Sequence, residues 1–313
     1  MLFPWQMRRL GRMSLIVLSL ALGVGLCLHA EQRPSFRSTI ALVLLNVTVT
    51  GPAGRYVSDL APADFEILEE NRPQELAFFS PTNTPLSVSL VLDTSSSMDE
   101  EMPVAKQAAL DFIARLRPGD VAEVVSFDSH VEIVQRLTGD RSLLEAAIQR
   151  LRAGGSTSLY NALYIVLRQL AKLKPASGDE IRRQVIVVLS DGEDTSSLVT
   201  FEDLLDSVKR SQTSIYTIGL GLENPLTKRA EGEFALRQLA QETGGRLFLP
   251  KRPADLADVY TEIANELTSQ YVLGYLSSNA AAPMGDSWRR VAVRVRRPNL
   301  QARTRAGYFA SAP

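Results

Sequence analysis

The stretch from residue 85 to residue 270 alternates between short apolar strands and amphipathic helices, and this alternation constrains the fold most. Residues 185–189 are an uninterrupted run of valine, isoleucine and leucine, and residues 86–92 are nearly as apolar. Strands that are apolar on both faces occur in parallel sheets covered by helices on both sides. Further strands are expected at 121–127, 131–135 and 214–219, and helices at 103–116, 141–151, 159–173, 201–210, 233–242 and 256–267. The pattern predicts an α/β fold with a doubly wound, mostly parallel sheet over residues 85–270.

The segments on either side of this region are rich in β structure. The N-terminal segment, residues 31–84, has strand-like runs at 39–50, 65–68 and 75–80, and the C-terminal segment, residues 271–313, has them at 271–276, 290–296 and 303–309. Neither segment has enough strands to bury an apolar face alone. We therefore expect the C-terminal segment to pair with residues 38–80 in one small β domain, with the α/β domain inserted between them. Residues 277–287 are expected to form a hairpin loop.

Composition excludes several classes of protein. With 45% hydrophobic residues, 22% charged residues and a net charge of −1, the chain is neither a disordered protein nor a strongly basic nucleic-acid binder. One cysteine rules out a disulfide framework, and two histidines argue against a histidine-rich zinc site or a Ser-His-Asp enzyme. Phosphate-binding loop, dinucleotide-binding, zinc-protease and nucleophile-elbow motifs are all missing from the sequence. We therefore expect a protein that is not an enzyme and that binds neither nucleic acid nor an organic cofactor.

The first thirty residues have the pattern of an export signal. Arg8, Arg9 and Arg12 precede a stretch without charge from residue 13 to residue 28, and the small residue Ala30 then precedes a polar segment. These are the three regions of a secretory signal peptide, and the apolar run is short for a membrane-spanning helix. We expect residues 1–30 to be cleaved and the protein to be exported, to the periplasm or the extracellular space. The alternatives are an uncleaved N-terminal anchor and a lipoprotein modified at Cys27, which the bulky Leu26 before it disfavours.

Three polar motifs follow predicted strands or precede predicted helices. Asp93, Ser95 and Ser97 come at the end of the strand at 86–92, Thr157 precedes the helix at 159–173, and Asp191 ends the most apolar strand. The carboxyl ends of parallel strands form the crevice in which such sheets bind ligands. Carboxylate and hydroxyl oxygens are ligands that Mg²⁺ accepts. Alone, residues 93–97 would also suit a helix N-cap and residues 191–192 an ordinary turn.

Together the five residues Asp93, Ser95, Ser97, Thr157 and Asp191 resemble the metal-ion-dependent adhesion site of von Willebrand factor type A domains. The resemblance covers residues 86–270 and implies a Rossmann-like domain. It also implies that Ser95, Ser97 and Thr157 ligate Mg²⁺ or Mn²⁺ through their hydroxyls, while Asp93 and Asp191 supply charge, partly through water. Other features resemble exported bacterial proteins with a related domain: Phe65 in its Ala-Asp-Phe-Glu-Ile run, the glycine pairs at 154–155 and 244–245, and Gly307 with Tyr308.

Neighbouring acidic residues extend this interpretation. Glu100 and Glu101 stand where the β subunits of integrins, which look similar here, have two acids that help to bind an adjacent Ca²⁺. Acids favoured at a helix N-terminus explain the pair equally well. Glu193 and Asp194 are candidates for contact with a partner, with simple solvation as the alternative.

The resemblance implies an exported adhesion or protein-binding module whose metal binds a carboxylate of a partner protein. Two alternatives stay open. One is a metal-dependent hydrolase of phosphoryl or acyl groups, in which Glu193 or Asp194 would have to act as acid or base. The other is a structural scaffold whose metal site is vestigial.

The export signal makes a first testable prediction. N-terminal sequencing of the protein isolated from its native source should return Glu31 or a residue close to it. Removal of the leader takes away three arginines, and the net charge then changes from −1 to −4. A chain that keeps Met1 and sediments with membranes would indicate an anchor instead.

Overall fold

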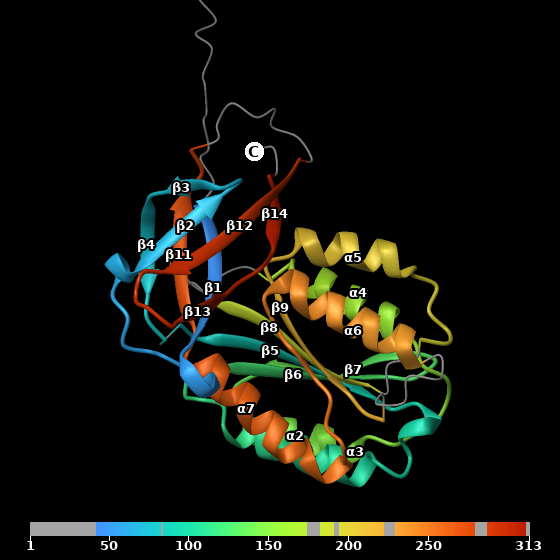
Figure 1. The fold of residues 1–313 in the computed structure, drawn as a ribbon. Helices are drawn as coiled ribbons and strands as arrows, with labels where there is room; N and C mark the ends of the chain where they lie inside the picture. The colour runs from blue at the N-terminus through green and yellow to red at the C-terminus, as the bar shows by residue number, and fades with distance from the viewer. Residues whose placement is uncertain are drawn as a thin grey trace, which may run out of the picture. The chain divides into compact units, whose positions relative to one another are not determined.

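The computed structural model describes residues 42–82, 84–173, 182–190, 194–221, 229–278 and 287–310, so the predicted leader lies outside the described residues. A six-stranded central sheet has the order β10-β9-β8-β5-β6-β7 (Figure 1). Its strands are β5 (Leu86–Asp93), β6 (Val121–Phe127), β7 (Val131–Thr138), β8 (Arg183–Ser190), β9 (Ser214–Gly219) and β10 (Leu247–Phe248). Neighbouring strands are parallel except β6 and β7, which are antiparallel. The predicted doubly wound, mostly parallel sheet is confirmed.

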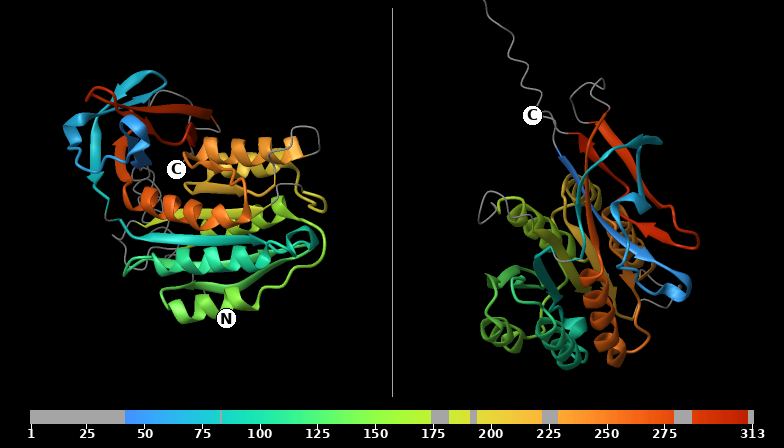
Figure 2. Two further views of the ribbon diagram at one scale, coloured as in Figure 1. Left: turned by 60° about the horizontal axis from the view of Figure 1, so that its bottom comes forward. Right: turned by 90° about the vertical axis from the view of Figure 1, so that its left-hand side faces the viewer.

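Helices cover both faces of this sheet (Figure 2). One hydrophobic core contains residues of α2 (Met102–Ala114), α3 (Arg141–Arg150) and α7 (Leu256–Thr268). The other contains residues of α4 (Leu159–Leu170), α5 (Phe201–Arg210) and α6 (Arg229–Thr243). In β8, Val187 and Leu189 enter the first core, whereas Ile186 and Val188 enter the second. This alternation explains why the strand is apolar at every position, since successive side chains point to opposite faces.

Two helix starts follow from local capping. The side chain of Asp140 accepts hydrogen bonds from the backbone N–H groups of Ser142 and Leu143 at the start of α3. Thr200 Oγ1 accepts from Asp203 N at 3.1 Å at the start of α5. Such caps satisfy backbone donors that have no partner inside the helix.

The two flanking segments form two four-stranded sheets, β13-β1-β11-β4 and β14-β12-β2-β3. Residues 42–80 supply β1 (Leu42–Thr50), β2 (Phe65–Glu69), β3 (Arg72–Gln74) and β4 (Leu76–Ser80). Residues 271–310 supply β11 (Tyr271–Leu276), β12 (Ser287–Val295), β13 (Gln301–Arg303) and β14 (Gly307–Ala310). The expected pairing of the two segments is present in four antiparallel ladders: β1 with β11, β1 with β13, β4 with β11 and β2 with β12. A third core, with Leu45, Ile67 and Tyr271 among its members, fills the β domain.

Two details of the C-terminal segment differ from the sequence-based prediction. The single strand predicted at 303–309 is two strands, because β13 pairs with β1 whereas β14 pairs with β12 in the other sheet. The predicted hairpin at 277–287 is also wrong, since β11 and β12 lie in different sheets and do not pair. Residues 279–286 of that connection lie outside the described residues.

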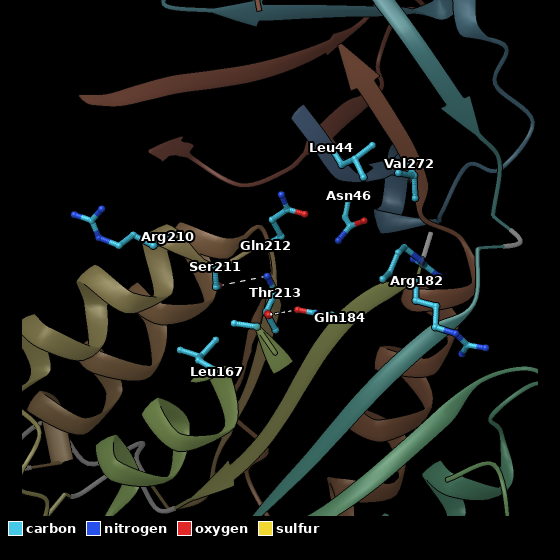
Figure 3. Close-up of a pocket in the computed structure, with 12 residues that line it drawn as sticks. Leu44, Asn46, Leu167, Arg182, Gln184, Arg210, Ser211, Gln212, Thr213 and Val272 are labelled. Carbon is cyan, nitrogen blue, oxygen red and sulfur yellow. Dashed lines mark hydrogen bonds between the residues drawn. The ribbon is translucent and has the colours of Figure 1, made fainter. Parts of the chain in front are cut away.

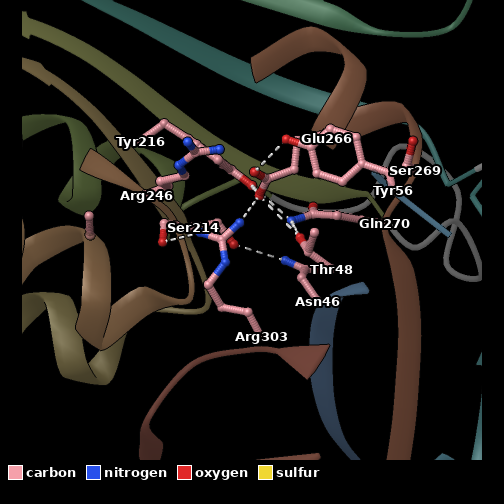
Figure 4. A network of polar contacts seen from close by, with 12 residues as sticks. Asn46, Thr48, Tyr56, Ser214, Tyr216, Arg246, Glu266, Ser269, Gln270 and Arg303 are labelled. Atoms are coloured by element: carbon pink, nitrogen blue, oxygen red, sulfur yellow. Dashed lines mark hydrogen bonds and ion pairs between the residues drawn. The ribbon is translucent and has the colours of Figure 1, made fainter. Parts of the chain in front are cut away.

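A buried carboxylate joins the β domain to the α/β domain (Figure 4). Glu266 of α7 is fully buried, and it accepts hydrogen bonds from Thr48 Oγ1 of β1 at 3.1 Å and from Tyr216 Oη of β9 at 2.5 Å. Tyr56 donates at 3.2 Å, and the Arg303 guanidinium forms an ion pair with the same carboxylate. Four donors from four parts of the chain therefore offset the cost of burying this charge.

A second buried carboxyl, Glu123 of β6, lies inside the central sheet without a cation in contact among the described residues. Its two oxygens accept hydrogen bonds from Ser89 Oγ at 2.5 Å and from Gln169 Nε2 at 2.7 Å. Burial raises the pKa of this carboxyl, and the hydrogen bonds and the charge of Arg136 only partly oppose the shift. Because the pKa is higher in the folded state, the stability that this group contributes is lost as the pH rises above its unfolded pKa.

Replacing this carboxyl with a neutral amide should therefore flatten the pH dependence of stability. We expect Glu123→Gln to be more stable than the wild type at pH 8, by about 1 kcal/mol or more, and to lose this advantage near pH 4. Urea unfolding at both pH values measures the difference. Glu145→Gln on the exposed face of α3 is the matched control. A variant that is equally destabilised at both pH values would contradict the prediction.

Candidate metal-binding site

Asp93 is held firmly at the carboxyl edge of the central sheet. It is the last residue of β5, and Ser190 is the last residue of the neighbouring strand β8. The carboxylate is 1% exposed; its Oδ2 accepts from Ser190 Oγ at 2.6 Å and its Oδ1 accepts from Ser95 N at 2.9 Å. Ser190 was not predicted as part of the site. The one feature of the sequence that points to Ser190 is its position as a hydroxyl residue at the end of the most apolar strand.

Ser95 and Ser97 present two hydroxyl oxygens beside this carboxylate. Their Oγ atoms are 3.0 Å apart, with Ser95 buried and Ser97 exposed. The backbone between them enters a short 3-10 helix, Ser96–Met98, and the buried side chain of Met98 anchors that turn in the first core. The predicted spacing of Asp93, Ser95 and Ser97 thus brings one carboxylate and two hydroxyls together at the end of β5.

The loop that contains Thr157 is tied to the loop after β5. Gly154 N donates to Thr94 O at 2.7 Å, and Ser96 N donates to Gly155 O at 3.0 Å. Gly155 has a φ of +80°, and a Cβ atom there would lie 2.8 Å from Ser129 Oγ, so this position requires glycine. Thr157 is 5% exposed, and its hydroxyl makes no hydrogen bond to another described residue. The structure therefore brings the Thr157 loop to the same edge of the sheet as Asp93.

The other residues predicted for the metal sites are only partly described by the structure. Asp191 and Glu193 lie outside the described residues, and Asp191 follows Ser190 directly in the chain. Glu100 is exposed, while Glu101 is the N-cap residue of α2 and uses its backbone carbonyl to accept from Ala105 N. In the described part of the chain, no three His, Cys, Asp or Glu side chains are grouped to hold a metal. The adjacent Ca²⁺ site stays a prediction without a carboxylate cluster to support it.

Asp194 has a structural role that the sequence analysis did not predict. Its Oδ2 accepts from Tyr160 N at 2.8 Å and from Ser197 Oγ at 2.6 Å, and its Oδ1 accepts from Ser197 N at 3.0 Å. Ser197 Oγ in turn accepts from Asn161 N at 3.0 Å. The loop after β8 therefore caps the N-terminus of α4, whose own N-cap residue Ser158 makes no side-chain cap. Contact of Asp194 with a partner protein stays a prediction. Both oxygens of its carboxylate already accept hydrogen bonds within the chain.

The donor set suits a hard divalent cation. Hydroxyl and carboxylate oxygens match the preference of Mg²⁺ and Mn²⁺, and the site has no sulfur or imidazole in its described part. Hydrogen bonds from Ser95 N and Ser190 Oγ orient the carboxylate of Asp93. Neutral hydroxyls would leave a bound cation with much of its positive charge, and a further anionic ligand would then be favoured.

A separate cavity of about 290 Å³ lies at the other end of the sheet (Figure 3). Its lining includes Gln184 near the start of β8 and Thr213 just before β9, with Leu44 and Val272 from the β domain. Gln184 and Ser190 are six residues apart in one strand, a distance of roughly 20 Å. The cavity is therefore not part of the site around Asp93.

Comparison with known proteins identifies the family of the α/β domain. The profile of the von Willebrand factor type A domain family matches residues 88–193. Inter-alpha-trypsin inhibitor heavy chain H1 of Sus scrofa is 29% identical over 218 residues, which are 63% of this chain and 23% of that protein. An uncharacterized protein of Synechocystis sp. is 37% identical over 112 residues, 35% of this chain and 26% of its own length. The solved structure of a von Willebrand factor type A protein from Catenulispora acidiphila aligns with a TM-score of 0.51 at 20% identity, over 79% of this chain and 62% of that one.

A doubly wound sheet with polar loops at its carboxyl edge, together with the family match, defines the class of protein. The chain contains a von Willebrand factor type A domain. It spans about a quarter of the length of the curated relatives it matches. Domains of this class are commonly adhesion or protein-interaction modules, and only some of them have a metal-dependent site.

The anchoring role of Asp194 makes a testable prediction. Asp194→Ala removes the acceptor for Tyr160 N and Ser197 N, and we expect it to lower the free energy of unfolding by about 1–2 kcal/mol. Asp194→Asn keeps one acceptor oxygen and should lose less. Thermal unfolding compares both with Glu145→Ala, which removes an exposed carboxylate elsewhere. Wild-type stability in Asp194→Ala would show that the carboxylate is free for another role.

Proposed function

We propose that this protein is an exported adhesion or protein-binding module that depends on Mg²⁺ or Mn²⁺. In this proposal Ser95, Ser97 and Thr157 hold the cation by their hydroxyls, and Asp93 and Asp191 supply charge, directly or through water. A carboxylate of a partner protein completes the coordination. The supporting observation is the buried, doubly hydrogen-bonded carboxylate of Asp93 beside two hydroxyls that are 3.0 Å apart.

The charge of such a site favours an acidic ligand. Hydroxyl ligands are neutral. When one or both protein carboxylates reach the divalent cation through water, little negative charge is in direct contact with it. A carboxylate from a partner is then a strong ligand, because charge-assisted contacts are shorter and stronger than neutral ones. Ser97 is the exposed member of the described set, so a partner would approach from its side.

Hydrolysis is the second function to be weighed. A metal-dependent hydrolase needs a general acid or base near the metal, and the sequence analysis offered only Glu193 and Asp194. Both oxygens of Asp194 already accept hydrogen bonds from the α4 N-terminus and Ser197, which weakens its candidacy. Binding without turnover is therefore the better supported function. Assay of p-nitrophenyl phosphate hydrolysis with and without Mg²⁺ tests the alternative directly.

Export is part of the proposal and rests on the leader-like residues 1–30. In the part of the chain that the structure covers, none of the helices has the length and apolarity needed to cross a bilayer. Adhesion or capture of a partner outside the cytoplasm agrees with a mature chain that would carry no cysteine once Cys27 is removed.

Metal binding should be visible as stabilisation. At 100 times its dissociation constant, a bound ion raises the free energy of unfolding by about 2.7 kcal/mol. For a domain of this size the melting temperature should then rise by roughly 5–11 °C, at about 2–4 °C per kcal/mol. Differential scanning calorimetry with Mg²⁺ or with EDTA measures the shift. We expect Ser97→Ala and Asp191→Ala to reduce it strongly.

The neighbouring Ser96 provides the matched control. It is exposed like Ser97 but is not one of the proposed ligands. Ser96→Ala should therefore keep the full response to Mg²⁺. If Ser97→Ala and Asp191→Ala respond to Mg²⁺ as the wild type does, the metal is bound elsewhere and the proposed site is wrong. If the wild type itself does not respond, the scaffold with a vestigial site is the better description.

A further inference from the structure

Helices α4, α5 and α6 lie side by side on one face of the α/β domain (Figure 1). Three aromatic rings in the N-terminal halves of these helices lie in a line. Tyr160 of α4 and Phe201 of α5 have ring centroids 5.6 Å apart, and Phe201 and Phe234 of α6 have centroids 6.4 Å apart. Both distances are within the range of favourable aromatic pairs. We call these three residues the aromatic rim. The rim connects three helices on one face of the α/β domain.

The rim leaves apolar surface open to solvent. Phe234 is 62% exposed, and Leu198, in the loop that precedes α5, is 93% exposed. The backbone N–H groups of Leu198 and Val199 each donate to Asn161 Oδ1 at 3.1 Å. The exposure of Leu198 is therefore enforced by a loop that is bonded to α4. Tyr160 and Phe201 are half-buried against the second core, so Phe234 is the ring of the rim that is most open to a partner.

Carboxylates surround the rim. Glu202 lies in the first turn of α5 and Glu231 in the first turn of α6. Within the described residues neither of them forms an ion pair, whereas Glu233 is paired with Arg237. Burial raises the pKa of the Tyr160 hydroxyl, and the charges of Asp194, Glu231 and Glu202 raise it further, so these acids lie within electrostatic range of the ring. An exposed aromatic ring such as that of Phe234, near carboxylates without an ion pair, is complementary to a cationic side chain.

One end of the rim, Tyr160, lies close to the proposed metal site. Tyr160 is three residues from Thr157, so their Cα atoms are at most about 11 Å apart. Tyr160 N donates to Asp194, which is three residues after Asp191 in the chain. A single partner segment of a few residues can therefore reach both places.

We propose that the aromatic rim binds a lysine or arginine side chain of the partner whose carboxylate binds the metal. The partner is thus a protein segment in which an acidic residue and a basic residue are separated by a few positions. This inference rests on the proposed function, because it assigns the second contact of the same ligand. The acidic first turns of α5 and α6 also complement the helix dipoles, but that role would not require exposed rings beside them.

Synthetic peptides test the inference without knowledge of the natural partner. Each acetylated and amidated peptide carries one aspartate followed, after one to four glycines, by arginine, by its neutral isostere citrulline or by norleucine. Dissociation constants are measured by isothermal titration calorimetry in excess Mg²⁺ and in EDTA. We expect arginine to bind roughly 3- to 30-fold more tightly than citrulline at one spacing at least. The binding of all three peptides should require Mg²⁺.

Variants of the aromatic rim and of its two neighbouring carboxylates test whether these residues cause the preference for arginine over citrulline. The double variant Glu202→Gln, Glu231→Gln and the single variant Phe234→Ala should each reduce the arginine preference to about twofold or less. Their affinity for the citrulline peptide and their response to Mg²⁺ should stay at the wild-type level. Glu145→Gln on α3, on the opposite face of the sheet, is the matched control and should keep the full preference.

The outcomes separate this inference from the proposed function. Mg²⁺-dependent binding with no preference for arginine, or with a preference for norleucine, overturns the cationic contact and leaves the metal site intact. If no peptide binds in the presence of Mg²⁺, the proposed function is wrong, and so is the idea that one partner segment contacts both the metal and the aromatic rim. Binding of a cationic side chain to the aromatic rim is then tested separately, by NMR titration with acetyl-arginine N-methylamide and its citrulline analogue. Saturable shifts of the Tyr160 and Phe234 ring protons for arginine alone support a cation site there, and their absence overturns it.

Discussion

Strands β5 and β8 are buried on both faces, and this double burial decides where the polar chemistry of the α/β domain lies. Their side chains alternate between two cores covered by helices. Polar groups that need a ligand or water are therefore favoured at the strand ends, where the chain leaves the sheet. Asp93 and Ser190 occupy the last positions of adjacent strands and bond to each other at 2.6 Å. The loop with Ser95 begins at this edge, and the loop with Thr157, which follows α3, is hydrogen-bonded to it.

The β domain depends on a different constraint, because its strands come from both ends of the α/β domain. β4 and β11 pair directly, so the entry and exit of the inserted domain lie side by side. Glu266 then connects the two domains by accepting hydrogen bonds from β1 and β9. The environment of Glu123 is different: among the described residues its donors are two neutral groups, and burial raises its pKa. Two equally buried carboxyls thus differ in their electrostatic environments. Glu266 is in direct contact with a guanidinium, whereas Glu123 accepts hydrogen bonds from neutral groups and feels Arg136 only as a more distant charge.

Much of the candidate site could be found in the sequence, because its chemistry is local. Asp93, Ser95 and Ser97 lie within five residues, and the strand before them fixes which edge of the sheet they occupy. Ser190 and the anchoring role of Asp194 could not be found in the same way. Their hydrogen bonds join residues that are 97 and 34 positions apart, and no spacing rule identifies such partners. The aromatic rim was missed for the same reason, since its three rings come from three helices.

By itself, the sequence determined the fold class and the positions of most strands and helices. These follow from the period and length of apolar runs, which depend on each residue and its near neighbours. Only the tertiary structure decided which strand lies beside which. A period of two identifies a strand but not its partner, so β13 and β14 separated into two sheets, as did β11 and β12. The burial of Glu266 was decided in the same way, because its donors come together only after distant segments have packed.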